Sequence, residues 1–411
     1  MIEVVNLEEL CTGIIDCPHS TPKWQDKGIP VIRNYNLKDG KIDCANLSFV
    51  SEEDYKERVK RAIPEESDII ISREAPMGVV GIVPKGFQCC LGQRLVLLKI
   101  DKSKCLPKYL LYTLMSEYVQ LQIRRINQTG SIVSNLNISS LKELKILLHN
   151  FEEQSKIATI LSSIDDKISL NNQINQELEA MAKTLYDYWF VQFDFPDQNG
   201  KPYKSSGGKM VYNPELKREI PEGWGVEKLS SLLEIGRETI NPMKTPKEKF
   251  KYYSIPEYDV SGSFSYELGE TIKSNKFLVE KSDLLVSKLN PWFNRVVYNL
   301  EENAISSTEF IVWKTFNQSE KNFLYQVATS KGFIEYCTRF ATGTSNSHKR
   351  VSPDIMVGFQ IPFEKTYIQK FGEITDSIRT QVLQNNVQNQ ELTQLRNWLL
   401  PMLMNGQVKV E

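Results

Sequence analysis

Two stretches of the chain lack acidic residues and are rich in side chains that bind phosphate groups. Residues 118–142 and residues 336–353 contain no Asp or Glu but many Ser, Thr and Asn. Cations neutralise phosphate charge and hydroxyl groups donate hydrogen bonds to its oxygens, so both windows favour contacts with a nucleic-acid backbone. A polar loop with a chance charge bias is the alternative for either window alone. The candidate contacts are Arg124, Arg125, Thr129, Ser131, Arg339, Thr342, Thr344, Lys349 and Arg350.

A proline-bracketed loop near the start of the chain offers further polar side chains. Residues 16–24 contain two prolines, and around them stand His19, Ser20, Thr21 and Lys23. Such a loop can present side chains to the base edges in a DNA groove. A lone histidine in a loop can equally be a solvated side chain without a role.

Two more cations follow β-branched runs that resemble each other. Arg73 follows Ser67–Ser72, and Lys288 follows Ser282–Ser287. Either cation can contact a phosphate or pair with a carboxylate, and the sequence leaves both interpretations open.

Signatures of catalysis are missing from the sequence. No glycine-rich dinucleotide loop or P-loop occurs, and three histidines without a Cys-x-x-Cys pair predict no metal site. Residues 290–293 read Asn-Pro-Trp-Phe and resemble the Asn-Pro-Pro-Tyr/Phe loop of adenine methyltransferases. The second proline and a preceding AdoMet loop are absent, so we expect a turn after a strand at 284–287. The chain is therefore predicted to have no catalytic residues and no cofactor of its own.

Composition is that of a soluble globular protein with a balanced charge. The chain has 411 residues, 50 Lys and Arg against 51 Asp and Glu, and a net charge of -1. A DNA-binding chain of this charge must gather its cations locally or share the task with partners. The seven cysteines lack the spacing of metal ligands, which favours free thiols in a reducing cytoplasm. The sequence shows no leader and no long apolar run, so we expect a cytoplasmic protein without a membrane span.

The sequence contains an internal repeat of about 210 residues. Residues 171–178 read NNQINQEL and residues 385–392 read NNVQNQEL, with six of eight positions identical. Three further matches follow in the same order at nearly the same offset: Ser67–Arg73 with Ser282–Lys288, Thr129-Gly130 with Thr342-Gly343, and Leu7–Leu10 with Leu229–Leu232. A tandem duplication explains this order better than chance does.

Each copy has a β-rich half followed by a long amphipathic helix. Strands are expected at 68–72, 79–83 and 95–100, and helices from about 151 to 191 and from about 364 to 405. Apolar residues of the first helix recur at heptad positions, with Ile174 and Met181 expected in the buried seam. The two helices supply partners for each other, which predicts a coiled coil.

Two asparagines, Asn171 and Asn385, occupy the same heptad slot near the middle of their helices. An antiparallel pair would bring them together, and a buried Asn pair would fix the helix register. Two solvated asparagines that merely share ancestry are the alternative. The paired interpretation predicts that replacing both by Leu raises the melting temperature and loosens the register.

The fold class expected is α+β, with two globular mixed α/β halves separated by two long antiparallel coiled-coil helices in a pseudo-two-fold repeat. This layout resembles the specificity subunits of type I restriction–modification systems. Phe151–Ile157 resembles the family's Glu-Gln-x-x-Ile helix start, Leu185–Val191 its helix end, and Ile220–Trp224 the Ile-Pro-x-Gly-Trp that opens the second domain. The two Thr-Gly loops also fit. Residues 362–368 lack the Glu-Gln pair, which leaves the start of the second helix open.

The resemblance implies two target-recognition domains, 1–150 and 224–363, helical regions at 151–192 and 364–405, and a connector at 193–223. Each domain would read half of a bipartite, asymmetric site in double-stranded DNA, and the helices would set the gap. Two methyltransferase subunits would dock and bring AdoMet. Whether restriction or translocase subunits that use ATP also join stays open.

Two other classes of protein are weighed against this hypothesis. A coiled-coil scaffold that binds only proteins would not show DNA affinity that falls steeply with salt. A fused methyltransferase or nuclease would bind AdoMet or cut DNA as an isolated chain, and the specificity-subunit hypothesis expects no AdoMet binding by this chain alone.

Overall fold

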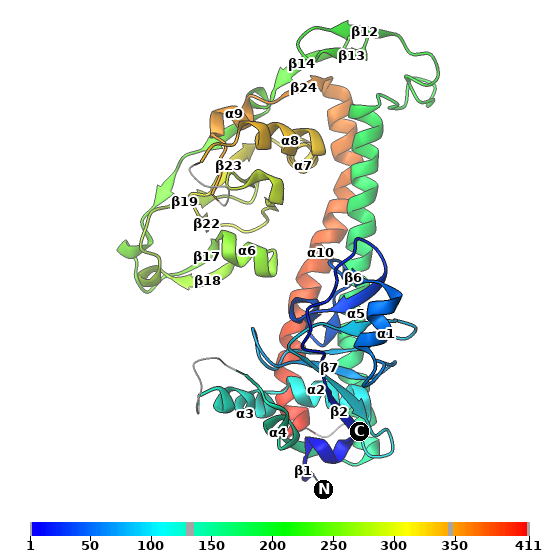
Figure 1. Ribbon diagram of the computed structural model, residues 1–411. Coiled ribbons are helices and arrows are strands. Elements are labelled where there is room, and N and C mark those ends of the chain that lie inside the picture. The colour runs from blue at the N-terminus through cyan, green and yellow to red at the C-terminus, as the bar shows by residue number, and fades with distance from the viewer. Residues whose placement is uncertain (1, 129–134, 344–347, 409–411) are drawn as a thin grey trace. The chain divides into compact units, whose positions relative to one another are not determined.

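The computed structural model describes residues 2–128, 135–343 and 348–408. The chain divides into two compact units: the first comprises Met1–Asn171 and Val387–Glu411, and the second comprises Asn172–Asn386. Both chain ends therefore belong to the first unit (Figure 1). No described helix is long and apolar enough to cross a membrane.

The first unit is built around an antiparallel sheet of order β2-β10-β7-β8. A smaller sheet of order β6-β3-β9 packs beside it, and β3 pairs with β9 in parallel. The strands are β1 (Glu3–Asn6), β2 (Cys11–Asp16), β3 (Ile29–Ile32), β4 (Leu37–Lys38), β5 (Lys41–Ile42), β6 (Ser48–Val50), β7 (Ile69–Ser72), β8 (Val80–Ile82), β9 (Cys90–Leu91), β10 (Leu95–Ile100) and β11 (Lys145–Leu148). The strands expected from the β-branched runs are confirmed as β7, β8 and β10.

Helices cover this sheet and bury its apolar face. All four residues of β7 are buried, because β-branched side chains on both faces pack against neighbouring layers. The helices of this part of the chain are α1 (Glu52–Arg58), α2 (Pro107–Met115), α3 (Glu117–Gln128), α4 (Ile138–Lys142) and α5 (Phe151–Tyr186). The start of α5 and the end of the last helix complete the core, where Leu161 and Leu403 are buried with Tyr109 and Leu110.

The second unit contains a sheet of the same order, β15-β23-β20-β21, beside a larger sheet of order β16-β19-β22-β17-β18. Its strands are β12 (Met210–Asn213), β13 (Arg218–Pro221), β14 (Gly225–Lys228), β15 (Leu233–Gly236), β16 (Thr239–Ile240), β17 (Lys249–Tyr253), β18 (Ser265–Leu268), β19 (Lys276–Val279), β20 (Leu284–Ser287), β21 (Val296–Tyr298), β22 (Ala304–Ser306), β23 (Phe310–Thr315) and β24 (Gln360–Phe363). Its helices are α6 (Ile255–Ser261), α7 (Gln318–Ala328), α8 (Lys331–Phe340), α9 (Pro353–Val357) and the first part of α10 (Lys365–Met404), whose residues from Val387 onward belong to the first unit.

The internal repeat of the sequence is also a repeat of the fold. Strands β2, β10, β7 and β8 correspond in order and pairing to β15, β23, β20 and β21. The terminal pair β1–β11 likewise corresponds to β14–β24. Helices follow in the same order in both copies, ending in the long helices α5 and α10.

The long helices pack antiparallel in each unit. In the first unit, Asp165 of α5 pairs with Arg396 of α10, and Asn171 lies against Gln388, so partner numbers fall as α5 advances. In the second unit, Asn175 bonds to Asn386 and Glu179 pairs with Arg379, with the same direction. The predicted antiparallel coiled coil is confirmed (Figure 1).

The seam between the helices differs from the predicted heptad in one respect. Ile174 and Met181, expected in the seam, are 37% and 58% exposed, whereas their neighbours Asn175 and Ala182 are buried. A helix of 3.6 residues per turn drifts against a 3.5-residue repeat, so periodicity alone does not choose between adjacent positions. The hydrogen bonds of Asn175 turn this face inward and leave Ile174 and Met181 outside.

The two asparagines expected to meet have other partners instead. Asn171 donates from Nδ2 to Gln388 Oε1 (2.8 Å) and to Asn389 Oδ1 (2.9 Å). Asn385 donates to Asn175 Oδ1 (2.8 Å). Each predicted asparagine is buried but bonds to a residue one turn beyond the one expected, so their direct pairing is corrected. Each copy has two asparagines four residues apart, Asn171 and Asn175 in the first and Asn385 and Asn389 in the second. The sequence is therefore also compatible with this shifted pairing of the helices.

These partners change the expected effect of mutation. Replacing only Asn171 and Asn385 by Leu removes the bonds from Asn171 to Asn389 and from Asn385 to Asn175, so the Oδ1 atom of buried Asn175 loses its donor. A buried acceptor left without a donor costs about 1–3 kcal/mol. We expect that double variant to melt at a lower temperature. Replacing all four by Leu removes both members of each pair, and should raise the melting temperature while loosening helix register. Circular dichroism melting checks both, and a quadruple variant less stable than the double one would contradict the assignment.

The connector after α5 packs as an aromatic cluster in the second unit. A π-helical turn, Asp187–Val191, ends the helix, and its Phe190 ring lies 4.9 Å from that of Phe323. Trp224 stacks on Phe195 with ring centroids 4.9 Å apart. The segments Leu185–Val191 and Ile220–Trp224 therefore contribute Tyr186, Trp189, Phe190 and Ile220 to the core of the second unit.

Candidate nucleic-acid interface

Loops from four places in the chain meet at one end of the sheet in the first unit. We define loop cluster 1 as residues 17–24, 33–36, 73–77 and 92–94. They follow β2, β3 and β7 or precede β10, and strand register places these strand ends together. Hydrogen bonds join the loops: Gln93 Nε2 donates to His19 O (2.7 Å), and Asn34 Nδ2 donates to Glu74 O (2.9 Å).

The predicted residues of the proline-bracketed loop lie in this cluster and are exposed. His19, Ser20, Thr21 and Lys23 all have exposed side chains. His19 Nε2 lies 3.2 Å from Asp16 Oδ2, so this histidine is tethered to a carboxylate. Lys23 makes no salt bridge with any residue that the structure describes.

Arg73 is engaged within the protein. Its Nη1 donates to both carboxylate oxygens of Asp16 (2.8 and 2.9 Å), and its Nε donates to Leu136 O (3.0 Å). Of the two interpretations left open by the sequence, this geometry favours the carboxylate pair. Arg73 also ties Leu136 to loop cluster 1, because it exchanges hydrogen bonds with that residue.

The first acid-free window has few exposed cations without a partner. Arg124 pairs with Glu117, which lies one residue before the window, and Arg125 also has an interaction partner. Thr129 and Ser131 lie outside the described residues. In its described part, the window holds loop cluster 1 in place, because Leu136 N donates a hydrogen bond to Arg73 O (3.0 Å).

The second unit has the corresponding cluster at the same end of its sheet. We define loop cluster 2 as residues 288–295, 342–343 and 348–351. Lys288 N donates to Glu309 O (2.9 Å) and Val351 N donates to Lys288 O (3.0 Å). In the first unit Arg73 N donates to Arg94 O, and the bond from Leu136 matches that of Val351. Duplication has preserved individual hydrogen bonds at this end of the sheet.

Cations of loop cluster 2 and of the neighbouring helix α8 differ in whether they pair with a carboxylate. Arg350 pairs with Glu309 (2.9 Å), whose hydrogen bond raises the pKa of the guanidinium. Lys288, Lys349 and Arg339 make no salt bridge with any described residue. Thr342 is exposed and exchanges backbone hydrogen bonds with Arg350, and Thr344 lies outside the described residues.

The Asn-Pro-Trp-Phe segment is a rigid turn. Asn290 and Asn294 adopt left-handed backbone conformations (φ 47° and 50°) around a 3₁₀ turn, η7 (Pro291–Phe293). Asn290 Oδ1 accepts a hydrogen bond from Lys349 N (3.0 Å), so this amide is used within the fold. The predicted turn after the strand is confirmed.

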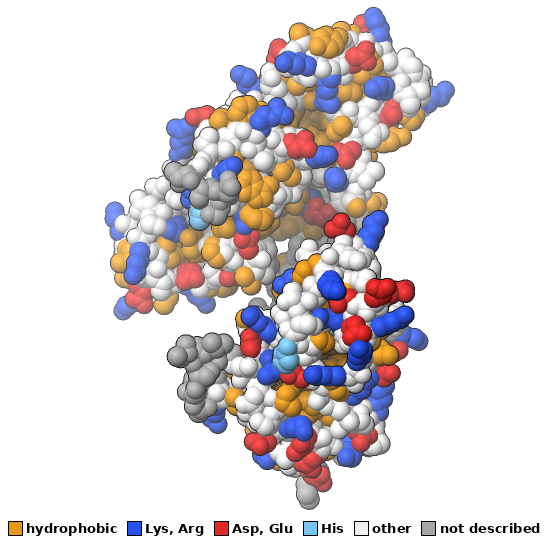
Figure 2. Space-filling model, viewed as in Figure 1, with side chains coloured by type: hydrophobic (Ala, Val, Ile, Leu, Met, Phe, Trp, Pro, Cys, Tyr) orange, Lys and Arg blue, Asp and Glu red, His pale blue; other side chains and the backbone are white. Residues whose placement is uncertain are grey.

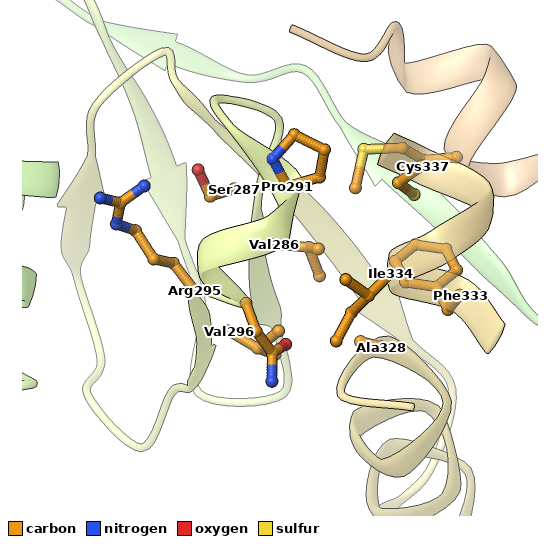
Figure 3. Close-up of a pocket in the computed structure, with 11 residues that line it drawn as sticks. Val286, Ser287, Pro291, Arg295, Val296, Ala328, Phe333, Ile334 and Cys337 are labelled. Atoms are coloured by element: carbon orange, nitrogen blue, oxygen red, sulfur yellow. The ribbon is translucent and has the colours of Figure 1, made fainter. Parts of the chain in front are cut away.

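Figure 3 shows how this turn is anchored. Pro291 faces Cys337 and Ile334 of α8 across a cavity of about 10 Å³, which has space for about one water molecule at most. Trp292 and Phe293 are exposed on the turn. The guanidinium of Arg295 lies 4.5 Å from the ring of Phe293 and pairs with Asp259.

Comparison with known proteins agrees with this architecture. A family model described as type I restriction modification DNA specificity domain matches residues 2–180. The type I restriction enzyme MjaIX specificity subunit of Methanocaldococcus jannaschii is 26% identical over 386 residues, which cover 90% of this chain and 86% of that protein. Along nearly its whole length the chain is similar to type I restriction–modification specificity subunits, and residues 2–180 match the DNA specificity domain of that family.

A second curated relative and a solved structure are also similar to this chain. The type I restriction enzyme HindI specificity subunit of Haemophilus influenzae is 24% identical over 371 residues, covering 74% of this chain and 78% of that protein. The solved S subunit of a type I restriction–modification system from M. genitalium superposes with a TM-score of 0.56 at 16% identity. That match covers 98% of this chain and 96% of that chain, and it shows a shared fold.

The chain carries its charge in small groups. On the face shown in Figure 2, Lys and Arg side chains alternate with Asp and Glu over both units. Among the described residues no group of three or more His, Cys, Asp or Glu could hold a metal ion.

Sequence reasoning missed the aromatic residues of both clusters. Trp24, Tyr35 and Arg33 are exposed in loop cluster 1, as are Trp292 and Phe293 in loop cluster 2. Asp16, which holds Arg73 and His19, was also missed. Aromatic residues interleaved with arginine within short loops were the available signal.

Proposed function

We propose that loop clusters 1 and 2 each read one half of a bipartite, asymmetric DNA target. The observation that carries this proposal is the presence of two corresponding loop clusters, each at the same end of a duplicated sheet. Both clusters present exposed hydroxyl groups, aromatic rings and cations without carboxylate partners. Such side chains suit contacts with phosphates and base edges.

The different side chains of the two clusters imply different half-sites. Loop cluster 1 presents His19, Ser20 and Arg33, whereas loop cluster 2 presents Trp292, Phe293 and Lys349. The shared hydrogen bonds position both sets on the same framework. The two clusters share a backbone framework but differ in their exposed side chains. We expect this arrangement when both domains keep the same position on DNA but read different bases.

Partner subunits would supply the chemistry that this chain lacks. We propose that two methyltransferase subunits dock on this chain, bring AdoMet and flip the target adenine out of the duplex. Restriction or translocase subunits that use ATP would be further additions. Exposed apolar residues of the helices support docking: Ile174 and Met181 on α5, Tyr188 on the π-helical turn that follows it, and Leu395 and Trp398 on α10. Met181 and Leu395 occupy equivalent positions in the two copies.

Salt dependence tests the DNA-reading role. Besides Arg33, four cations of the clusters and their surroundings lack ion pairs with described residues: Lys23, Lys288, Arg339 and Lys349. If they neutralise about four phosphates, affinity for the target should fall about 10²-fold between 50 and 200 mM salt. Fluorescence anisotropy with the subunit co-purified with its methyltransferase partners measures this. Affinity that does not change with salt, or equal affinity for every sequence, would favour the protein-only scaffold.

A further inference from the structure

One arginine of loop cluster 1 lies between two exposed aromatic rings. The Cζ atom of Arg33 lies 5.2 Å from the ring centroid of Trp24 and 4.9 Å from that of Tyr35. Arg33 Nη1 also donates to Tyr35 Oη (3.4 Å), which lies 3.3 Å from Ser48 Oγ. Stacking on two rings holds the planar guanidinium in one orientation at low cost in side-chain entropy.

The charge of Arg33 is not used inside the protein. Arg73 and Arg94 of the same cluster pair with Asp16 and Glu74, and Arg58 is buried and donates to backbone carbonyls. Arg33 makes no salt bridge with any described residue, and its side chain is exposed. Its donors on the face away from Tyr35 can therefore bind an external acceptor.

The backbone beneath Arg33 is fixed by hydrogen bonds. Arg33 N donates to Asn36 Oδ1 (3.0 Å), and Asn36 N donates back to Arg33 O (2.9 Å). The amide of Asn36 is fully buried and donates to Asp43 O and Asn46 O. Gly92 closes the other side, where an added Cβ would lie 3.3 Å from Arg33 Cγ. The arginine is thus held on a rigid base.

From this arrangement we propose that Arg33 reads a guanine in the half-site bound by the first unit. A guanidinium presents two parallel N–H donors, and guanine presents O6 and N7 as paired acceptors in the major groove. Trp24 and Tyr35 act as positioning residues that orient the fork. This inference rests on the proposed DNA-reading function and names one of the residues that determine its specificity.

The experiment replaces each guanine of the target in turn by 7-deazaguanine, which lacks the N7 acceptor. In the wild-type complex with its methyltransferase partners, one replacement should weaken binding about 5- to 150-fold, the range for a bidentate contact. The complex with Arg33→Ala should bind the unmodified target about 5- to 150-fold more weakly than the wild-type complex does. Placing 7-deazaguanine at the same position should not weaken its binding further. Arg33→Lys keeps the charge but not the fork, so it should also lose the response.

Arg61→Ala is the matched control. Arg61 is an exposed arginine of the same unit that lies on no aromatic ring of a described residue, so its removal should leave the response to 7-deazaguanine intact. The methylated motif should become degenerate at one base pair with Arg33→Ala and remain unchanged with Arg61→Ala. An Arg33 variant that keeps the wild-type response, or a wild-type complex insensitive at every guanine of a defined target, overturns the assignment. A wild-type complex without sequence preference contradicts the proposed function itself.

Discussion

Lengthening both long helices by one heptad is expected to lengthen the unread gap of the DNA target by about three base pairs. Duplicating residues 166–172 in α5 and residues 388–394 in α10 adds about 10 Å to each helix at 1.5 Å per residue. The base-pair rise of DNA is about 3.4 Å. The two segments lie opposite each other in the antiparallel pair, and the duplication repeats the contact of Asn171 with Gln388 and Asn389. Both half-sites should remain the same, since no loop cluster is changed.

Sequencing of methylated sites in cells that express the lengthened chain measures the gap directly. A variant with the insertion in α5 alone is the matched control, because it breaks the helix pairing and should abolish methylation rather than change the gap. A lengthened pair that still selects the original gap would contradict the role of the helices as a spacer.

Replacing Asp165 by Leu is expected to destabilise the first unit by about 3–5 kcal/mol, because it leaves a buried arginine without its carboxylate. Asp165 Oδ1 accepts from Arg396 Nη1 (2.8 Å), and its Oδ2 accepts from Tyr112 Oη (2.7 Å). Lys41 Nζ donates to the Asp165 carbonyl (3.2 Å). This network connects the globular part of the unit with both long helices. The melting temperature should fall by about 6–20 °C, as measured by calorimetry.

Two variants separate this effect from a general loss of charge. Glu152→Leu removes the carboxylate of an exposed i,i+4 pair with Lys156 on the same helix, and should change stability by less than about 0.5 kcal/mol. Combining Asp165→Leu with Arg396→Met removes both charges and should recover most of the lost stability. If Asp165→Leu melts like the wild-type protein, the buried ion pair has no structural role.

The duplication and the architecture could be predicted because they follow from patterns that repeat along the chain. The recurrence of NNQINQEL as NNVQNQEL and the β-branched runs before Arg73 and Lys288 reflect packing demands that both copies share. Burial of a strand or a helix face constrains many residues at once, so such patterns persist. The predicted turn at Asn290 follows in the same way from local backbone preference.

Individual side-chain partners could not be predicted, because they depend on contacts between distant residues. Asn171 bonds to Asn389 rather than Asn385, a difference of one helical turn that a repeat of asparagines does not determine. Arg73 pairs with Asp16, which lies 57 positions away in the sequence. The surroundings of Arg33 form only in the folded chain, where Trp24 and Tyr35 lie against its guanidinium. Charge along the sequence therefore could not separate Arg73, which pairs with Asp16, from Arg33, which lies on two aromatic rings.

The central claim is that this chain selects the DNA sequence on which its partners act. Genome-wide mapping of methylated adenines, in cells with the partner subunits and with or without this chain, tests it most directly. We expect a bipartite motif, two short defined segments separated by a fixed gap, to be methylated only when the chain is present. The same adenines methylated in its absence, or no methylated motif that depends on it, would contradict the account.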